Sequence, residues 1–148
     1  RPISAYRMNV EDENTAAAES SRMAFRMAGI THKDVDACEL YDCFTYTVEA
    51  TLRDYGFFRR EEVRDFLTAE RLGPGGLFPV NTSGGMLSEG YFMGLTPVAE
   101  AVMQLRGECG QRQLGTVPGT KTPEIIVCSD NGGVFHSHAT LVLGREAK

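Results

Sequence analysis

The segment ACELYDCFTYTVEATLRDYG, residues 37–56, contains the step from strand to helix on which the fold depends. Its apolar start, Ala37–Leu40, predicts a short strand. Asp42 is a residue type that favours helix N-caps, so we expect it to begin a helix over Cys43–Tyr55 that ends at Gly56. The side chains that recur at helical spacing, and should therefore be buried, are Phe44, Val48, Leu52 and Tyr55.

Helical segments also lie on both sides of this stretch. Upstream, Thr15–Ala28 carries a stripe of small and apolar residues, and Gly29 provides a C-terminal stop. Downstream, Glu61–Leu72 predicts a shorter helix. Thr96-Pro97 predicts the N-cap and first turn of a third main helix, which ends at Gly107.

The C-terminal part predicts a β-hairpin. Glu124–Ser129 and Ala139–Gly144 are apolar and rich in β-branched residues, and the glycine-containing stretch Asp130–Ser137 joins them. We expect these two strands to pair in antiparallel fashion. Helices that alternate with strands and close on a hairpin indicate an α/β fold, with a layered sheet and flanking helices.

Composition and charge narrow the classes of function. The chain has 148 residues, of which 42% are hydrophobic and 24% are charged, as in ordinary globular domains. The formal net charge is -5, and nucleic-acid binding needs clustered basic residues, so we expect no nucleic-acid partner. No apolar run approaches the roughly 20 residues that cross a bilayer, so we expect a cytoplasmic protein without a membrane segment.

The cysteines and the first residues lead to two further expectations. The cysteines form no C-x-x-C pair, which argues against a zinc ribbon and favours reduced thiols. The polar start Arg1–Ser4 lacks the apolar core of a secretory signal. Because the chain begins without Met, we expect it to be a piece of a longer protein.

An irregular glycine-rich stretch precedes the helix that starts near Thr96. It contains Asn81–Gly85 and Gly90–Gly94, and long loops in compact domains are often functional because glycine lets backbone approach a ligand closely. The alternative is a structural loop whose glycines only relieve crowding, since no phosphate-loop motif is present. The residues alone leave both interpretations open.

Three other positions could carry chemistry. Tyr41 follows a predicted strand, where open α/β sheets place ligands, although a tyrosine that only packs its ring is the commoner case. His136 and His138 share a strand face and could bind a metal, but no third ligand is evident, so we predict no metal site. Cys128 ends an apolar strand and is by default a buried, inert thiol.

Four motifs in order resemble the C-terminal half of the thiolase superfamily. Tyr41-Asp42-Cys43-Phe44 stands where ordinary thiolases have Asn-Glu-Ala-Phe, and Asn81–Gly85 matches Asn-x-x-Gly-Gly. Gly90–Gly94 matches Gly-His-Pro-x-Gly, and Cys128–Gly133 contains the counterpart of Cys-x-Gly-Gly-Gly. Leu105–Glu108 and Arg112-Gln113, shortly before Pro118-Gly119, further resemble the sterol-carrier and lipid-transfer branch.

The departures from these motifs define the site that the resemblance implies. Tyr91 replaces the thiolase histidine and Tyr41 replaces an asparagine. The second thiolase cysteine corresponds to Cys128, or, if Gly132-Gly133 are aligned, to Ser129 or Asp130. The implied catalytic residues are Tyr91, Tyr41, Cys128 and Asp130. The implied substrate-binding residues are Asn81, Gly84, Gly85, Gly90, Gly132 and Gly133.

Two tyrosines at these positions imply aldol chemistry. A phenol with a pKa of about 10 is a poor base for a cysteine thiol, but it can exchange a proton with a substrate hydroxyl. The pattern resembles the thiolase-like aldolases of bacterial steroid side-chain degradation. It implies a retro-aldolase that acts on a β-hydroxyacyl-CoA thioester and needs no dissociable metal or redox cofactor.

The same resemblance implies an assembly. Residues 1–148 form one thiolase-like C-terminal domain, which we expect to be inactive until it meets an N-terminal half and, usually, a homodimer partner. A small acyl-CoA-binding subunit of zinc-ribbon and OB-fold type is a further expected partner. Two alternatives stay open: a degradative β-ketoacyl-CoA thiolase or acyltransferase, and a non-catalytic half that only scaffolds a complex.

Overall fold

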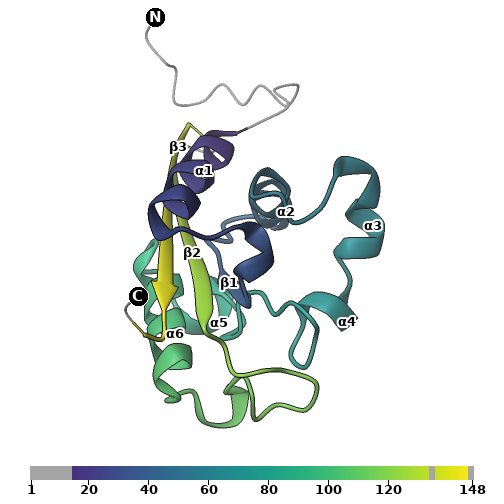
Figure 1. Ribbon diagram of the computed structural model, residues 1–148, viewed down its shortest axis with the longest axis vertical. Coiled ribbons are helices and arrows are strands. Elements are labelled where there is room, and N and C mark those ends of the chain that lie inside the picture. Colours follow the sequence, from purple (N-terminus) through teal and green to yellow (C-terminus); the bar gives the residue numbers. More distant parts are fainter. Residues whose placement is uncertain (1–14, 134–135, 147–148) are drawn as a thin grey trace, which may run out of the picture.

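The computed structural model describes residues 15–133 and 136–146 (Figure 1). The start Arg1–Ser4 and part of the link between the last two strands therefore lie outside the described residues. The helices are α1 (Ala16–Ala28), α2 (Thr45–Asp54), α3 (Val63–Phe66), α4 (Ala69–Leu72), α5 (Met86–Glu89) and α6 (Leu95–Arg106), with 3₁₀ turns η1 (His32–Asp34), η2 (Arg60–Glu62) and η3 (Gly110–Arg112). The strands are β1 (Ala37–Glu39), β2 (Ile125–Gly132) and β3 (Ser137–Gly144).

The strands form one mixed sheet in the order β1-β2-β3. β1 runs parallel to β2, with Cys38 opposite Val127, and β2 runs antiparallel to β3, with Val127 opposite Val142. The predicted hairpin is confirmed. Its ladder is longer than predicted because it continues to the pair Gly132 and Ser137.

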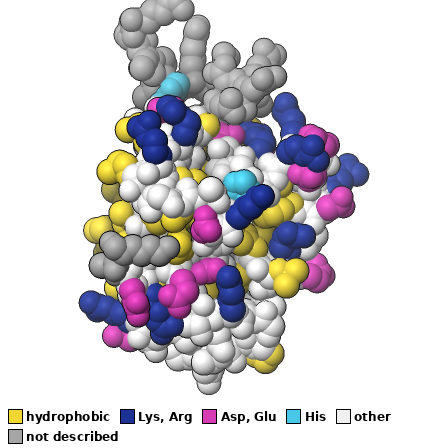
Figure 2. All heavy atoms as spheres, in the orientation of Figure 1, with side chains coloured by type: hydrophobic (Ala, Val, Ile, Leu, Met, Phe, Trp, Pro, Cys, Tyr) yellow, Lys and Arg dark blue, Asp and Glu magenta, His cyan; other side chains and the backbone are white. Residues whose placement is uncertain are grey.

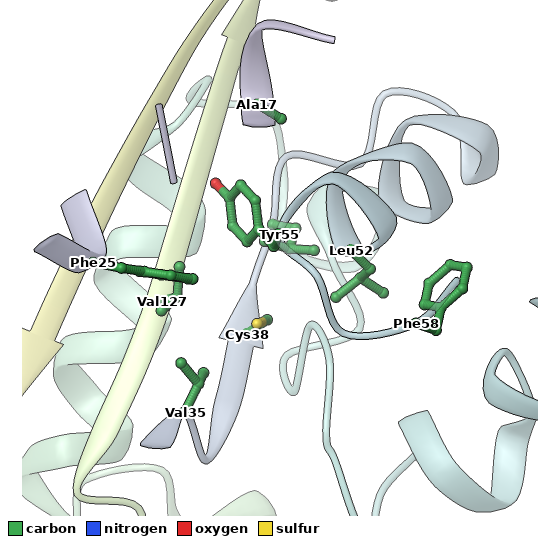
Figure 3. Packing of buried hydrophobic residues seen from close by; sticks show 9 residues of the cluster. Ala17, Phe25, Val35, Cys38, Leu52, Tyr55, Phe58 and Val127 are labelled. Carbon is green, nitrogen blue, oxygen red and sulfur yellow. The ribbon is translucent and has the colours of Figure 1, made fainter. Parts of the chain in front are cut away.

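Helices cover both faces of this sheet, which confirms the predicted α/β layers. Figure 1 shows α1 crossing β3 on one face, and α2 joins α1 there. Figure 3 shows the core of this layer, in which Phe25 of α1, Leu52 of α2 and Tyr55 at the C-terminal end of α2 pack around Cys38 and Val127 of the sheet. Complete burial of a side chain such as Leu52 contributes roughly 1.5–3 kcal/mol to stability.

The other face packs against α6. Ala101 of α6 meets Ala37, Ile126 and Cys128, all of which are buried. Because side chains alternate along a strand, Glu39 and Tyr41 point toward this same face as Ala37. The strand β1 therefore directs two polar side chains at the layer that α6 closes.

The helix α1 has the ends that its sequence predicts. The Thr15 hydroxyl accepts a hydrogen bond from the Ala17 amide at 3.1 Å, and Gly29 adopts a left-handed conformation at the C-terminus. Gly107 ends α6 in the same left-handed conformation.

The predicted start of α2 is wrong. The helix begins at Thr45 with Phe44 as its N-cap, and the Thr47 hydroxyl donates to the Phe44 carbonyl at 2.6 Å. Asp42 instead accepts from the Met86 amide at 3.3 Å, at the start of α5. Because the chain turns out toward α5 before the helix starts, Phe44 is 64% exposed rather than buried.

Two other predicted helices differ in their limits. α6 has Gly94 as its N-cap, so Thr96 lies inside the first turn, where its hydroxyl donates to the Gly90 carbonyl. The predicted helix Glu61–Leu72 is divided into η2, α3 and α4 because Leu67 leaves helical conformation.

The charged side chains on the surface and the lengths of the helices bear on the classes of function that the composition excludes. Figure 2 shows acidic and basic side chains interspersed over one face of the molecule. Within the described ranges, no helix is long and apolar enough to span a membrane.

Candidate active site

Two tyrosines meet at the carboxyl end of β1. Tyr41 follows that strand, and Tyr91 lies in the loop between α5 and α6, 50 residues further along the chain. Their hydroxyl oxygens lie 2.8 Å apart, and their ring centroids are separated by 6.1 Å at an interplanar angle of 63°. The fold therefore joins the two phenols by a short hydrogen bond.

The two members of this pair differ in exposure. Tyr41 is only 8% exposed, and its backbone amide donates to the Ser129 carbonyl of β2 at 3.2 Å. Tyr91 is 58% exposed. Tyr41 is thus fixed by the sheet, whereas Tyr91 is the phenol that a molecule outside this chain can reach.

The surroundings of Tyr41 keep its phenol neutral. The hydrogen bond with Tyr91 raises the pKa of Tyr41 above the usual range for phenols, and burial adds to the effect. The nearby Cys43 and Asp130 also disfavour a phenolate at this position. Tyr41 therefore keeps its proton at neutral pH, and either hydroxyl can be the donor in the pair.

The Tyr91 loop is anchored at both ends. The Thr96 hydroxyl donates to the Gly90 carbonyl and accepts from the Phe92 amide, both at 3.3 Å. A Cβ atom at Gly94 would collide with the Asp130 side chain, so only glycine allows the start of α6 to approach β2 this closely. Asp130 of β2 therefore lies against this loop, and its charge contributes to the raised pKa of Tyr41.

The Asn81–Gly85 loop is fastened to β1. The Asn81 backbone amide donates to the Cys38 carbonyl at 2.9 Å, and the Asn81 side-chain Oδ1 atom accepts from the Leu40 backbone amide at 2.6 Å. At Gly85, with φ 76°, an added Cβ would collide with the Asp42 carboxylate. The loop is therefore shaped by contacts with residues 38–42, and the substrate-binding role of Asn81, Gly84, Gly85 and Gly90 stays a prediction.

Cys128 is buried between β2 and the start of α6. Its thiol is 1% exposed and faces the Pro97 carbonyl, 3.8 Å away. Burial raises the pKa of the Cys128 thiol far above its usual value, so this thiol is held protonated. Gly132 and Gly133 end β2 next to residues 134–135, which lie outside the described ranges.

Apolar surface borders the site. A groove of about 480 Å³ starts at Phe92, the residue after Tyr91, and runs between α6 and the sheet. Its apolar walls include Leu95 and Leu141, and its polar lining is Ser129, Asp130 and Thr140. Phe92 and Leu95 are 71% and 72% exposed.

The histidines take no part in this site. His138 Nε2 lies 2.9 Å from the Tyr55 hydroxyl, on the face of the sheet that α1 and α2 cover. Among residues 15–133 and 136–146, no group of three His, Cys, Asp or Glu side chains lies close enough to hold a metal ion.

Sequence reasoning missed three residues that shape the site. The sequence predicts Asp42 as the N-cap of the wrong helix, Thr96 as the N-cap of α6 and Glu39 only as part of a strand. A polar residue in an otherwise apolar strand was the available signal for Glu39, because such a residue must find buried partners. No local sequence pattern predicts that Asp42 binds Met86 or that Thr96 binds Gly90.

A family model, several curated proteins and a solved structure are similar to this chain. A family model described as thiolase C-terminal domain-like matches residues 4–145. A 17-hydroxy-3-oxo-4-pregnene-20-carboxyl-CoA lyase of Mycobacterium tuberculosis is 40% identical over 86 residues, which is 58% of this chain and 22% of the relative. A steroid side-chain-cleaving aldolase of Thermomonospora curvata is 41% identical over 83 residues, 56% of this chain and 21% of the relative.

A solved structure is similar over more of the chain. An Ltp2-ChsH2(DUF35) aldolase superposes with a TM-score of 0.75 and 30% sequence identity, and the match covers 90% of this chain and 33% of the aldolase chain. The chain thus spans about a fifth of the length of the two curated relatives and a third of the solved one.

Proposed function

The chain belongs to the thiolase C-terminal domain-like family, and from this premise we propose that it is the tyrosine-bearing half of a retro-aldolase that cleaves a β-hydroxyacyl-CoA thioester. The observation that carries the proposal is the contact between the Tyr41 and Tyr91 hydroxyls, 2.8 Å apart at the end of β1. Lyase and aldolase relatives support the reaction type.

The reaction needs a base at the β-hydroxyl. In aldol cleavage that hydroxyl loses its proton, the bond between the α and β carbons breaks, and the bonding electrons form the enolate of a shorter acyl-CoA. We assign the base to Tyr91, because it is the exposed member of the pair. Tyr41 stays protonated and donates to the Tyr91 oxygen, where it stabilises negative charge.

The apolar groove beside Tyr91 favours a bulky acyl group. Phe92, Leu95 and Leu141 give it the surface that a ring system or branched lipid would bury. The CoA thioester is the substrate, and the proposed chemistry uses no further cofactor. The names of the relatives refer to a pregnene carboxyl-CoA and to steroid side chains, so we propose a degraded steroid or a similar lipid as the acyl group.

The proposed enzyme is an assembly. We propose that this chain acts with an N-terminal half of the thiolase fold, in a homodimer, and with a small acyl-CoA-binding subunit of zinc-ribbon and OB-fold type. The name of the Ltp2-ChsH2(DUF35) aldolase, which joins two components, supports a second subunit. The exposed apolar side chains around Tyr91 support a covering partner.

Substitution of the tyrosines in the assembled enzyme tests the proposal. Tyr91→Phe and Tyr41→Phe should each lower the turnover of a β-hydroxyacyl-CoA by about 100-fold or more, measured as release of a ketone or aldehyde and one shorter thioester. Tyr46→Phe, in α2 and outside the pair, should stay within about threefold of the parent enzyme.

Two outcomes would contradict the proposal. Turnover of Tyr91→Phe within threefold of the parent would remove Tyr91 from catalysis. Consumption of free CoA with formation of two thioesters would identify thiolysis instead of aldol cleavage.

A further inference from the structure

A hydrogen-bonded chain of polar side chains is buried beneath the site. It runs from Glu39 on β1 through Thr82 to Glu100 on α6, and Gln104 and Arg112 complete it. Glu39, Glu100 and Gln104 are each 1% exposed. Two carboxyl groups buried this deeply require an explanation, because an uncompensated buried charge is costly.

The Thr82 hydroxyl lies between the two carboxyl groups. Its Oγ1 atom is 2.7 Å from Glu39 Oε1 and also 2.7 Å from Glu100 Oε1. A hydroxyl has one proton and can donate to only one of them. If both carboxyl groups were ionised, one oxygen of the pair would face the Thr82 oxygen at 2.7 Å with no hydrogen between them.

The remaining contacts show which carboxyl holds the extra proton. Arg112 donates to both oxygens of Glu100, with an Nη2 to Oε2 distance of 2.9 Å, and the Gln104 amide donates to Glu100 Oε1 at 3.1 Å. Within the described part of the chain, no cation forms an ion pair with Glu39. Glu100 is therefore the ionised member.

With a proton on Glu39, the Thr82 hydroxyl is fully satisfied. In that state Glu39 would donate to the Thr82 oxygen across their 2.7 Å contact while Glu39 Oε1 accepts from the Thr82 backbone amide, the Gln104 amide would donate to the same Thr82 oxygen at 3.1 Å, and Thr82 would donate to Glu100. A hydroxyl offers two acceptor positions and one donor, and all three are used.

Glu39 also borders both loops of the site. A cavity of about 10 Å³ is lined by Glu39, Asn81, Ser83 and Thr96, among others. Thr82 follows Asn81, whose side chain binds the backbone of β1, and Thr96 holds the ends of the Tyr91 loop. Glu39, which holds Thr82 in place, therefore contributes to the placement of the two loops of the site, Asn81–Gly85 and Gly90–Gly94.

We propose that Glu39 is a positioning residue that keeps a proton at neutral pH, donates it to Thr82, and so fixes the Asn81–Gly85 loop against β1 and α6. The effect on turnover rests on the proposed function, whereas the protonation state does not. Loss of the proton would leave a second negative charge next to Glu100 with no cation to pair with it.

The surroundings of Glu39 raise the pKa of its carboxyl group, as a retained proton requires. Burial is the largest cause that raises the pKa of Glu39, Glu100 of α6 and Glu89 of α5 act in the same direction, and the hydrogen bonds from Thr82 oppose them; together they bring this pKa to about 8. Burial acts to raise the pKa of Glu100, but Arg112, Thr82 and Gln104 outweigh it and lower that pKa. The other titratable groups that interact with Glu39 are the thiols of Cys38, Cys109 and Cys128.

Nuclear magnetic resonance of glutamate side-chain carboxyl carbons, in the enzyme that contains this chain, tests the protonation directly. One resonance should titrate near pH 8 and be missing in Glu39→Gln. Its absence in the parent, or its persistence in Glu39→Gln, would overturn the proposal. This measurement does not depend on catalysis, so it separates a failure of this inference from a failure of the retro-aldolase proposal.

Activity against pH tests the positioning role. Glu39→Gln still donates to Thr82, so it should keep turnover within about threefold of the parent at pH 7 and lose the decline that the parent shows above about pH 8. Glu39→Ala cannot donate and should lower turnover by about tenfold or more at both pH values. Equal losses in Glu39→Gln and Glu39→Ala at pH 7 would refute the role of the donated proton.

Discussion

At the residue scale, the contact between Gly85 and Asp42 shows how closely the loops of the site approach β1. Gly85 has φ 76° and ψ -173°, a backbone conformation that residues other than glycine rarely adopt. The Asp42 carboxylate occupies the space that a Cβ atom would need. Gly85 belongs to the Asn81–Gly85 motif, but the steric reason that the position requires glycine is Asp42, 43 positions away in the sequence.

The change Gly85→Ala should therefore destabilise the protein. We expect a loss of about 2–4 kcal/mol in the free energy of unfolding, measured by urea titration. Gly107→Ala is the control, because Gly107 has a φ of 77° but no atom within 4 Å of its Cβ position. That change should cost only about 1–2 kcal/mol.

A double-mutant cycle separates the steric part from the backbone part. Adding Asp42→Ala removes the colliding carboxylate, so Gly85→Ala should cost at least about 1 kcal/mol less in that background. Equal costs in both backgrounds would show that Asp42 has no steric effect on Gly85.

At the scale of the elements, local signals predicted α1 well and α2 less well. Thr15 and Gly29 cap α1 through contacts with their own neighbours, and such contacts can be read from a short window of sequence. Asp42 accepts from the first backbone amide of α5, 44 residues away, and Thr96 binds the Gly90–Gly94 loop from inside α6. Residue type was informative in both cases, but the partner depended on how distant segments pack.

The tyrosine pair illustrates the same limit at the site. The order of the motifs predicts Tyr41 and Tyr91 as site residues, but no local sequence pattern predicts that their hydroxyl groups are in contact. Their contact depends on the pairing of β1 with β2 and on the anchoring of the Gly90–Gly94 loop by Thr96. The buried chain from Glu39 to Arg112 was not predicted, because its members come from four separate segments.

The layer between α1 and the hairpin should make stability depend on pH. Burial lowers the pKa of His138 from its usual value of about 6.5 to about 4, because the folded protein disfavours the charged ring. The unfolded chain binds a proton more readily in this range, so stability present above pH 6.5 is lost as pH falls toward 4. The loss from this group should reach up to about 3 kcal/mol.

Urea titrations at several pH values measure this effect by comparison of variants. His138→Gln should flatten, relative to the parent, the dependence of the unfolding free energy on pH between pH 4 and 6.5. The comparison matters because the raised pKa of Glu39 gives the opposite slope, with stability lost as pH rises toward 8. An unchanged slope in His138→Gln would contradict the assignment.

At the scale of the whole molecule, apolar side chains gather around the outer side of the site. Leu87 is 99% exposed, and Phe92, Met93 and Leu95 are 71%, 57% and 72% exposed. Exposed apolar patches of this kind are typical of interfaces. The face that presents Tyr91 is therefore also the face on which we expect the rest of the enzyme to lie.

Mixing this chain with an N-terminal half of the thiolase fold tests that expectation. We expect no measurable lyase turnover from the chain alone and recovery of turnover on mixing, with protection of the 87–95 segment from hydrogen exchange. Leu87→Ser should weaken the association by about tenfold, whereas Met27→Ser, an exposed change on α1, should leave it unaffected. Full turnover by the isolated chain would refute the two-half assembly.

The parallel pairing of β1 with β2 has a consequence for folding kinetics. It joins Tyr41 to Ser129, 88 residues later in the chain, so closing that long loop carries an entropic cost before any contact compensates for it. Both tyrosines leave the ribosome well before β2 is synthesised. The hydroxyl pair should accordingly form late, after the central ladder has closed, and its appearance would mark the completion of folding.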